Sequence, residues 1–190
     1  MKTFINDSRK WAKGRFPFFR LILLIYLAYV GIHHIGNPVY SSWFGGLNLG
    51  IHELGHIVFS FFGKFIMVAG GSILQCLVPI ISIFIFYRQR DFFAISISFG
   101  WLSTNLFYVA TYIADSRSMS LPLVSPFGCE PLHDWNYILG KMGMLNYDTA
   151  LASFIRLAAI VSMLICLVYG GWLVWLMLKS FNANFKTEKD

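Results

Sequence analysis

Charged residues are scarce in this chain. Only 13% of its 190 residues are Asp, Glu, Lys or Arg, whereas 57% are hydrophobic. Soluble domains carry about 25% charged residues, so this composition excludes an ordinary soluble protein and indicates a membrane protein. At ~20 residues per membrane helix, the length predicts an all-α integral membrane bundle of about five or six transmembrane helices. It leaves no room for a further soluble domain, so we expect residues 1–190 to form one membrane-embedded domain.

Cysteine is scarce as well. The chain has three cysteines, of which Cys76 and Cys166 lie in apolar runs and Cys129 lies in a polar connection. Three scattered cysteines exclude a disulfide framework and a zinc knuckle. We interpret the two in apolar runs as small hydrophobic residues.

Basic residues outnumber acidic ones, and the net charge is +6. They cluster at the two ends of the chain and form no basic face, so we expect no nucleic-acid partner. Residues 1–16 are a basic lead-in, which predicts a cytoplasmic N-terminus held against anionic membrane lipid. Residues 179–190 form a basic tail. The first apolar run is longer than a signal-peptide core, and we interpret it as a retained anchor.

Five apolar runs follow the lead-in, and they predict spans over residues 18–35, 46–62, 73–87, 92–113 and 148–178. The stretch 65–72 contains β-branched residues and two adjacent glycines. It favours an extended or re-entrant segment, with an ordinary connector as an equal alternative. The lead-in, the Arg88/Arg90 turn and the basic tail all favour the cytoplasm. Five simple crossings cannot satisfy all three, so either 65–72 or 134–146 is re-entrant or one basic cluster faces outward.

The second apolar run contains His52-Glu53-Leu54-Gly55-His56, an H-E-x-x-H pattern. Residues four apart lie on one face of an α-helix, so His52 and His56 can each give a nitrogen to one zinc ion. Glu53 can reach a water at that ion without binding the metal. These three are the only ionisable residues between positions 47 and 62, and such groups are costly in a membrane unless they are paired or bind an ion. The pattern predicts a zinc site; the alternative is that both histidines are packing residues.

A catalytic zinc ion usually has three protein ligands and one open position. The third ligand should be a His, Asp or Glu well downstream, and the candidates are Asp134, His133, Glu130, Asp115 and Asp148. Asp134 is preferred because it opens a predicted helix. A carboxylate at a helix start is also favoured by the helix dipole alone, which is the purely structural explanation. His133 is the first alternative, either as the ligand or as a hydrogen-bond partner of the metal site.

One polar residue, Asn105, lies in the middle of the apolar run 92–113. It could hold a substrate carbonyl or orient a ligand. Membrane helices also use Asn simply to bond to one another. Both roles stay open at this point.

Three motifs together resemble the site-2 protease group of intramembrane zinc metalloproteases, and more specifically its compact single-domain branch. They are H-E-L-G-H in a short apolar span, Ala69-Gly70-Gly71-Ser72-x-x-Gln75 at the start of the next segment, and His133-Asp134-Trp135 at a helix start. The resemblance covers about residues 46–146, the expected catalytic core. It implies that the two motif histidines and Asp134 bind Zn2+ and that Glu53 is the general base.

The expected function is hydrolysis of a peptide bond of a transmembrane protein substrate, within or near the bilayer. A substrate helix must unwind before attack, and 65–72 is the segment expected to hold the unwound strand. The expected substrate contacts are Gly70, Gly71, Gln75 and Asn105. The alternatives are a zinc-dependent membrane hydrolase of a lipid or small amide, a non-catalytic zinc-binding or transport protein, and an inactive scaffold. The sequence indicates no oligomeric state.

Overall fold

The computed structural model describes residues 2–123 and 132–187. Within these residues the chain forms seven α-helices and two short 3-10 turns, with no strand, which confirms the all-α prediction. In chain order they are α1 (Lys2–Ala12), α2 (Phe18–Gly36), α3 (Phe44–Val58), η1 (Ser60–Phe62), α4 (Lys64–Gln89), α5 (Phe92–Ala114), α6 (Asp134–Lys141), η2 (Leu145–Tyr147) and α7 (Asp148–Thr187).

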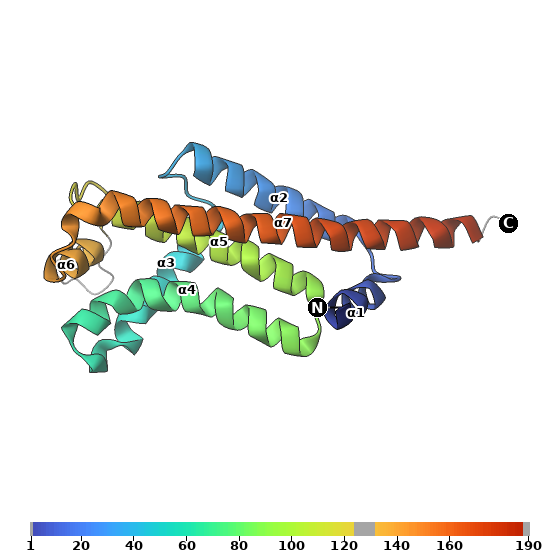
Figure 1. Cartoon of the computed structure of the whole chain (residues 1–190), viewed down its shortest axis with the longest axis horizontal. Coiled ribbons are helices and arrows are strands. Elements are labelled where there is room, and N and C mark those ends of the chain that lie inside the picture. The colour runs from blue at the N-terminus through green and yellow to red at the C-terminus, as the bar shows by residue number, and fades with distance from the viewer. Residues whose placement is uncertain (1, 124–131, 188–190) are drawn as a thin grey trace.

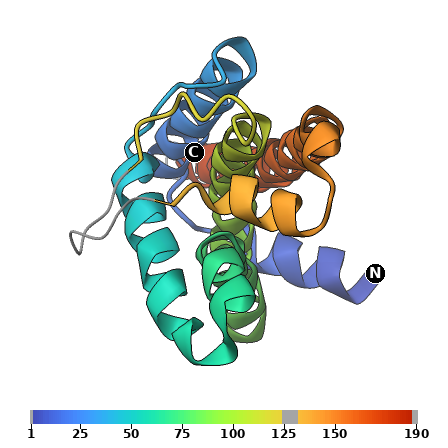
Figure 2. The ribbon, with the colours of Figure 1, turned by 90° about the vertical axis from the view of Figure 1, so that its left-hand side faces the viewer.

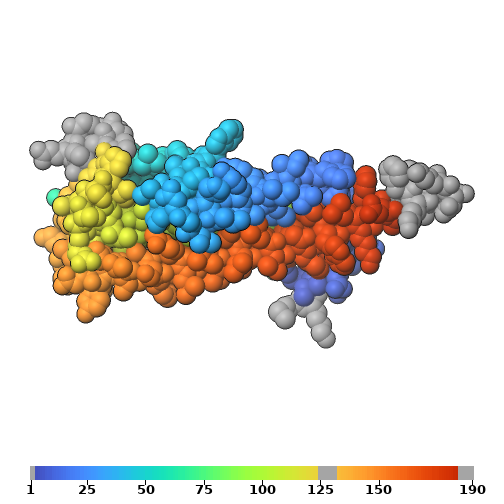
Figure 3. All heavy atoms as spheres, turned by 90° about the horizontal axis from the view of Figure 1, so that it is seen from above, coloured from blue at the N-terminus to red at the C-terminus, as the bar shows by residue number. Residues whose placement is uncertain are grey.

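The helices form an elongated bundle with α5 at its centre (Figures 1 and 2). Helix α5 is the most buried of the long helices and packs against α2, α4 and α7. Small residues permit this: Gly100 of α5 meets Leu27 of α2 and Cys166 of α7, where a Cβ atom would lie 2.9 Å from each side chain. Figure 3 shows α2 and α7 lying side by side along one face of the bundle.

Within residues 2–123 and 132–187, four helices, α2, α4, α5 and α7, are long and apolar enough to cross a membrane. This confirms a multi-pass integral membrane protein, but the expected five or six crossings are too many. The difference arises at the H-E-x-x-H segment, where α3 has only 15 residues. At ~1.5 Å per residue it is about 22 Å long, which is shorter than the ~30 Å hydrocarbon layer. Helix α6, with eight residues, is shorter still.

The segment 65–72 is helical, so the extended stretch and the ordinary connector, the two alternatives that the sequence left open, were both wrong. These residues form the first two turns of α4. Their glycines serve helix packing instead of an extended backbone: a Cβ atom on Gly55 of α3 would lie only 2.7 Å from the carbonyl carbon of Gly70. Close approach of two helices at small residues is a common packing mode in membranes.

The C-terminal helix is longer than expected. The sequence predicts a span over 148–178, whereas α7 continues to Thr187 and stays helical through Gly170 and Gly171. Gly170 faces both α5 and α2, where a Cβ atom would collide with Ser96 Oγ and lie 2.8 Å from Leu24 Cδ2. That glycine permits close packing and does not end the helix.

Candidate metal centre

The two motif histidines lie one turn apart on α3, with ring centroids separated by 4.9 Å. One turn earlier on the same helix, Asn48 is buried and bonds to α5: its Oδ1 accepts from Trp101 Nε1 at 2.9 Å, and its Nδ2 donates to Thr104 Oγ1 at 3.3 Å. These bonds fix the rotation of α3 about its axis. The histidine face is thereby directed into the protein, between α4, α5 and α6.

Asp134, 78 residues beyond the motif, meets both histidines. Its Oδ2 lies 2.9 Å from His52 Nε2 and 3.3 Å from His56 Nε2. Asp134 and His52 are both buried, at 6% and 8% exposure. Burial alone raises the pKa of Asp134, but hydrogen bonds from His52 and His56, which donate through Nε2 when that atom is protonated, outweigh burial and lower its pKa. The carboxylate is therefore the stable form of this side chain.

The second nitrogen of each ring has its own acceptor. His56 Nδ1 lies 2.9 Å from the carbonyl oxygen of Met67, and His52 Nδ1 lies 3.0 Å from Gln75 Oε1. A carbonyl oxygen can only accept, so Nδ1 of each ring carries the proton in the neutral form. The lone pair of each Nε2 then points at Asp134. Metal-binding histidines characteristically donate their other N–H in this way.

When both rings are in this neutral form, two imidazole lone pairs and a carboxylate oxygen converge on one point, and all three are acceptors, so a proton or a metal ion must lie between them. A shared cation satisfies them together. The N–O separations of 2.9 and 3.3 Å are close to the about 3.3 Å between two ligands of a tetrahedral zinc ion with bonds of about 2.0–2.1 Å. The donor set of two imidazoles and one carboxylate suits zinc. The residues present therefore fit such an ion.

Glu53 completes the set of side chains that could hold or serve a metal ion. We call His52, Glu53, His56 and Asp134 together the metal group. The ligand atoms of His52, Glu53 and His56 all lie within 4.8 Å of one another. Glu53 is half-buried and lines the cavity beside the histidines. With Asp134 against both rings, the carboxylate of Glu53 is the one free to act on a water molecule.

Gly71 provides space beneath the two rings. A Cβ atom at this position would lie 2.6 Å from His52 Nε2 and 2.8 Å from His56 Cε1. At Gly70 a Cβ atom would meet Phe59 Cβ at 2.7 Å. The adjacent glycines therefore let α4 pass directly behind the histidines.

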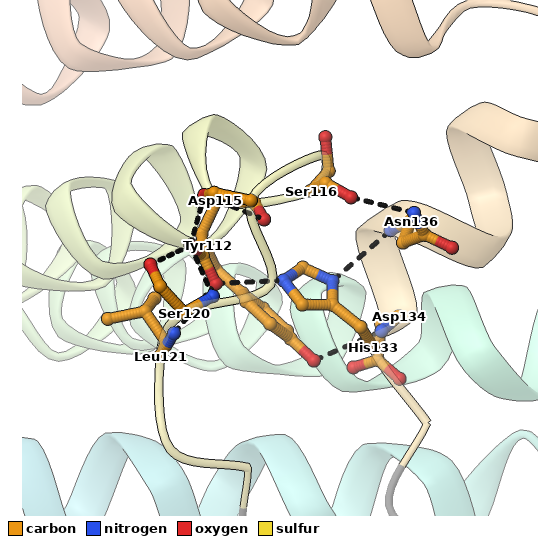
Figure 4. Close-up of polar contacts among 9 residues, drawn as sticks. Tyr112, Asp115, Ser116, Ser120, Leu121, His133, Asp134 and Asn136 are labelled. Atoms are coloured by element: carbon orange, nitrogen blue, oxygen red, sulfur yellow. Dashed lines mark hydrogen bonds and ion pairs between the residues drawn. The ribbon is translucent and has the colours of Figure 1, made fainter.

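Helix α6 is held by hydrogen bonds from its N-cap residue, His133, and from each of the next three residues. His133 Nε2 donates to Asp115 Oδ2 at 3.3 Å, and Asn136 Nδ2 donates to the Ser116 carbonyl at 2.7 Å. The backbone N–H of Asp134 donates to the hydroxyl of Tyr112 at 3.0 Å (Figure 4). On the other side, Trp135 Nε1 donates to Ser72 Oγ of α4 at 3.1 Å. Consequently α6 joins the ends of α4 and α5 and aims Asp134 at the histidines.

Asp115, just after α5, organises the turn that holds α6. Its two oxygens accept hydrogen bonds from the hydroxyls of Ser118 and Ser120 and from the backbone N–H groups of Ser120 and Leu121, besides the bond from His133. Burial raises the pKa of Asp115, but these hydrogen bonds outweigh it and hold the pKa well below its usual range. The carboxylate is charged at neutral pH and acts as a structural anchor.

A cavity of about 620 Å³ opens beside the metal group. Two connections form part of its wall: residues 38–41, between α2 and α3, and residues 121–123, after α5. The first is fastened to α5 because Thr111 Oγ1 donates to the Pro38 carbonyl at 2.8 Å. Away from the metal group the lining is mostly apolar or aromatic, as at Val39, Tyr40, Leu49, Val109, Leu123 and Leu132. Volumes of 300–1,000 Å³ are typical of ligand sites.

The other candidate ligands that lie in the described part of the chain, His133, Asp115 and Asp148, do not reach the histidines. His133 turns away, since its Nδ1 accepts from the Asn136 backbone and its Nε2 faces Asp115. Asp115 is occupied by the turn described above, and Asp148 pairs with Arg117 at 2.7 and 2.8 Å. Glu130 lies outside the described residues. Among the described candidates only Asp134 lies against both histidines.

Of the four residues expected to contact substrate, only Gln75 lines the cavity. Gln75 bonds to His52 and also lines the cavity, whereas Gly70 and Gly71 lie at the α3–α4 crossing. Asn105 is fully buried within α5, where its Nδ2 donates to the Trp101 carbonyl at 2.9 Å, and it does not line the cavity. Its Oδ1 has no hydrogen-bond partner among the residues that the structure describes. The structure thus joins Gln75, but not Asn105, to the site.

Sequence reasoning missed three groups that support the site. Asn48 had a recognisable signal, because it lies four residues before His52 and hence on the same helical face. No pattern in the sequence indicated Tyr112 or the carbonyl group of Met67. Their roles depend on which helices pack together, and a backbone carbonyl carries no sequence signature.

Comparison with known proteins finds no matching family model, no matching curated protein and no matching solved structure. The fold and the metal group therefore rest on the geometry of this chain.

Proposed function

We propose that this protein is an intramembrane zinc metalloprotease that hydrolyses a peptide bond of a membrane protein at or near the bilayer. One observation carries the proposal: Nε2 of both motif histidines points at Asp134, with Glu53 beside them at the edge of an apolar cavity. The resemblance of the three motifs to the site-2 protease group supports the same function.

The metal position would be held by His52, His56 and Asp134. When bound there, zinc supplies Lewis acidity, which polarises a carbonyl group and lowers the pKa of a nearby water toward ~7. Gln75 and the Met67 carbonyl hold the two rings in the orientation and tautomer that leave Nε2 free.

Glu53 acts as general base and then as general acid. Its carboxylate accepts a proton from the attacking water as the water oxygen bonds to the scissile carbonyl carbon. The C–N bond then breaks, and Glu53 returns the proton to the leaving amine nitrogen. Positioned proton transfer of this kind contributes about 10²–10⁴-fold to rate.

The substrate segment would lie extended in the cavity between α3, α5 and the two connections. The earlier expectation that residues 65–72 bind it by strand addition is withdrawn, because their backbone groups are used within α4. Apolar walls suit the side chains of an unwound membrane segment, and exclusion of water strengthens the electrostatics at the metal group.

The decisive variant is Glu53→Gln. We expect purified Glu53→Gln protein to bind zinc like the wild type but to lose cleavage at least about 100-fold, assayed in vesicles with labelled casein and a panel of single-span peptides. Ile57→Ala is the matched control, since Ile57 is exposed on the same helix and lies outside the cavity. Undiminished cleavage by Glu53→Gln would refute the mechanism. Hydrolysis of a fatty-acyl amide without peptide cleavage would replace the protease with a membrane amidase.

A further inference from the structure

Three basic segments of the chain meet at one end of the bundle. Asp7 of α1 pairs with Arg90 after α4 at 2.8 Å. The backbone N–H of Gly14 donates to Ser180 Oγ, late in α7, at 3.2 Å. Figure 1 shows the same arrangement, with α1, the α4–α5 turn and the far half of α7 on one side. The lead-in, this turn and the end of α7 therefore share one membrane face, which we call the basic end.

The basic end holds most of the positive charge. Among the described residues, all lysines and arginines lie in residues 2–20, 88–90 and 179–187 except Lys64, Arg117, Lys141 and Arg156. Of these four, Arg117 is neutralised by its two hydrogen bonds to Asp148. Short segments beside membrane helices carry an excess of lysine and arginine on the cytoplasmic side. If α2, α4, α5 and α7 cross the membrane and α3 does not, all three basic clusters lie on the same side. Five crossings could not place all three clusters in the cytoplasm, but four crossings can.

The metal group lies at the opposite end. Helix α5 begins at the basic end, where Asp91 caps it by accepting from the Ala94 N–H at 3.1 Å. Near its other end, Tyr112 accepts from the backbone of Asp134. From Asp91 to Tyr112 the helix rises about 30 Å at ~1.5 Å per residue, which is the thickness of the hydrocarbon layer. Asp134 is therefore about one membrane thickness from the basic end.

The cavity also belongs to that opposite end. Its wall includes residues 38–41, which follow the last turn of α2, and residues 121–123, which follow α5. Both helices begin at the basic end and run away from it (Figure 1). The end-on view shows α6 across this end of the bundle (Figure 2). Hence neither connection gives the basic end access to the metal group.

We propose that the metal centre opens on the non-cytoplasmic face of the membrane. As an extension that rests on the proposed protease function, the bond cleaved lies at the non-cytoplasmic end of a substrate's membrane segment. A cytosolic peptide cannot enter the cavity from its own side. The substrate class is therefore membrane proteins whose cleavable segment emerges on the outer side.

Thiol accessibility tests the orientation without requiring activity or metal. In full-length protein with alanine in place of Cys76, Cys129 and Cys166, one cysteine is introduced at Met142→Cys, just after α6, or at Gln89→Cys, the last residue of α4. Both positions are exposed. In intact bacterial cells a membrane-impermeant maleimide should label Met142→Cys but label Gln89→Cys only after permeabilisation. The reverse pattern, or the same pattern for both, would overturn the proposal.

Two further measurements keep the result decisive. Green fluorescent protein fused after residue 190 of the wild type should fluoresce, because that protein folds only in the cytoplasm; a dark fusion at normal expression counts against the proposal. EDTA added outside should remove zinc from wild-type protein in right-side-out vesicles but not in inside-out vesicles, and the opposite sensitivity would overturn the outward opening. If the wild type holds no zinc in either preparation, the proposed function fails while the labelling result still decides the orientation.

Discussion

The most informative single change is Gly71→Ala, because it adds one methyl group directly beneath the metal group. The new Cβ would lie 2.6 Å from His52 Nε2, whereas ordinary contact begins at 3.4 Å. The difference requires the ring to move by about 0.8 Å, unless α3 and α4 separate. Separation is resisted at the same crossing, where Gly55 contacts Gly70 and Gly71.

Helix propensity alone predicts the opposite sign. Alanine is favoured over glycine in a helix interior by about 1 kcal/mol, so without the steric contact this substitution would stabilise α4. A ligand nitrogen displaced by most of an ångström no longer fits bonds of about 2.0–2.1 Å. Perturbing the support of a ligand typically weakens metal binding 10- to 100-fold, and we expect Gly71→Ala to fall in or beyond that range.

The assay is zinc affinity of detergent-purified protein, measured by competition with a chromophoric chelator, together with the unfolding temperature. Gly50→Ala is the matched control, since it lies on α3 and a Cβ there meets nothing within 4 Å. The control should bind zinc like the wild type and unfold at the same or a higher temperature. Wild-type zinc affinity in Gly71→Ala would show that the histidines do not lie against α4 as described, and the site geometry would be wrong.

Three other predictions follow from the contacts of the site. Gln75→Leu removes the acceptor for His52 Nδ1 and should weaken zinc binding about 10- to 100-fold, whereas Gln75→Glu should retain it; equal affinity of the leucine variant would contradict the proposed support. Asp134→Ala should abolish stoichiometric zinc, while His133→Ala should only weaken it and lower the free energy of unfolding by about 1–3 kcal/mol; the reverse order would make His133 the ligand. Asp115→Asn should also lower the free energy of unfolding by about 1–3 kcal/mol at pH 7. Because folding lowers the pKa of Asp115, the stability difference between wild type and variant should persist down to about pH 4 and shrink as the pH falls further. A stability difference that grows with acidity in metal-free protein would refute this.

The local pattern of the sequence was sufficient for several features of this protein. Apolar runs with few charges identify the four long helices, because a membrane segment must satisfy its backbone internally and expose apolar side chains. The four-residue spacing of His52 and His56 places both rings on one helical face whatever the surrounding fold. The location of Asp134 at a helix start was predicted for a similar local reason. These properties depend on neighbours within a few residues, which the sequence displays directly.

Other features were decided only by tertiary packing. Residues 65–72 resemble a strand in isolation, yet they are helical because their glycines permit a close crossing with Gly55 of α3. Asp134 and His133 are adjacent in sequence and chemically plausible as ligands. Asp134 contacts the histidines and His133 binds Asp115 only because of the way α6 docks onto α5.

The sequence by itself determined the membrane class, the helical secondary structure of the long spans and the identity of the paired histidines. The number of crossings, the meeting of three basic segments at one end, and the side of the bundle that holds the metal group were decided by the tertiary structure. The physical reason is range. Propensity and periodicity act over one or two helical turns, whereas these features depend on contacts between residues 80 or more positions apart, such as Asp7 with Arg90 and His52 with Asp134.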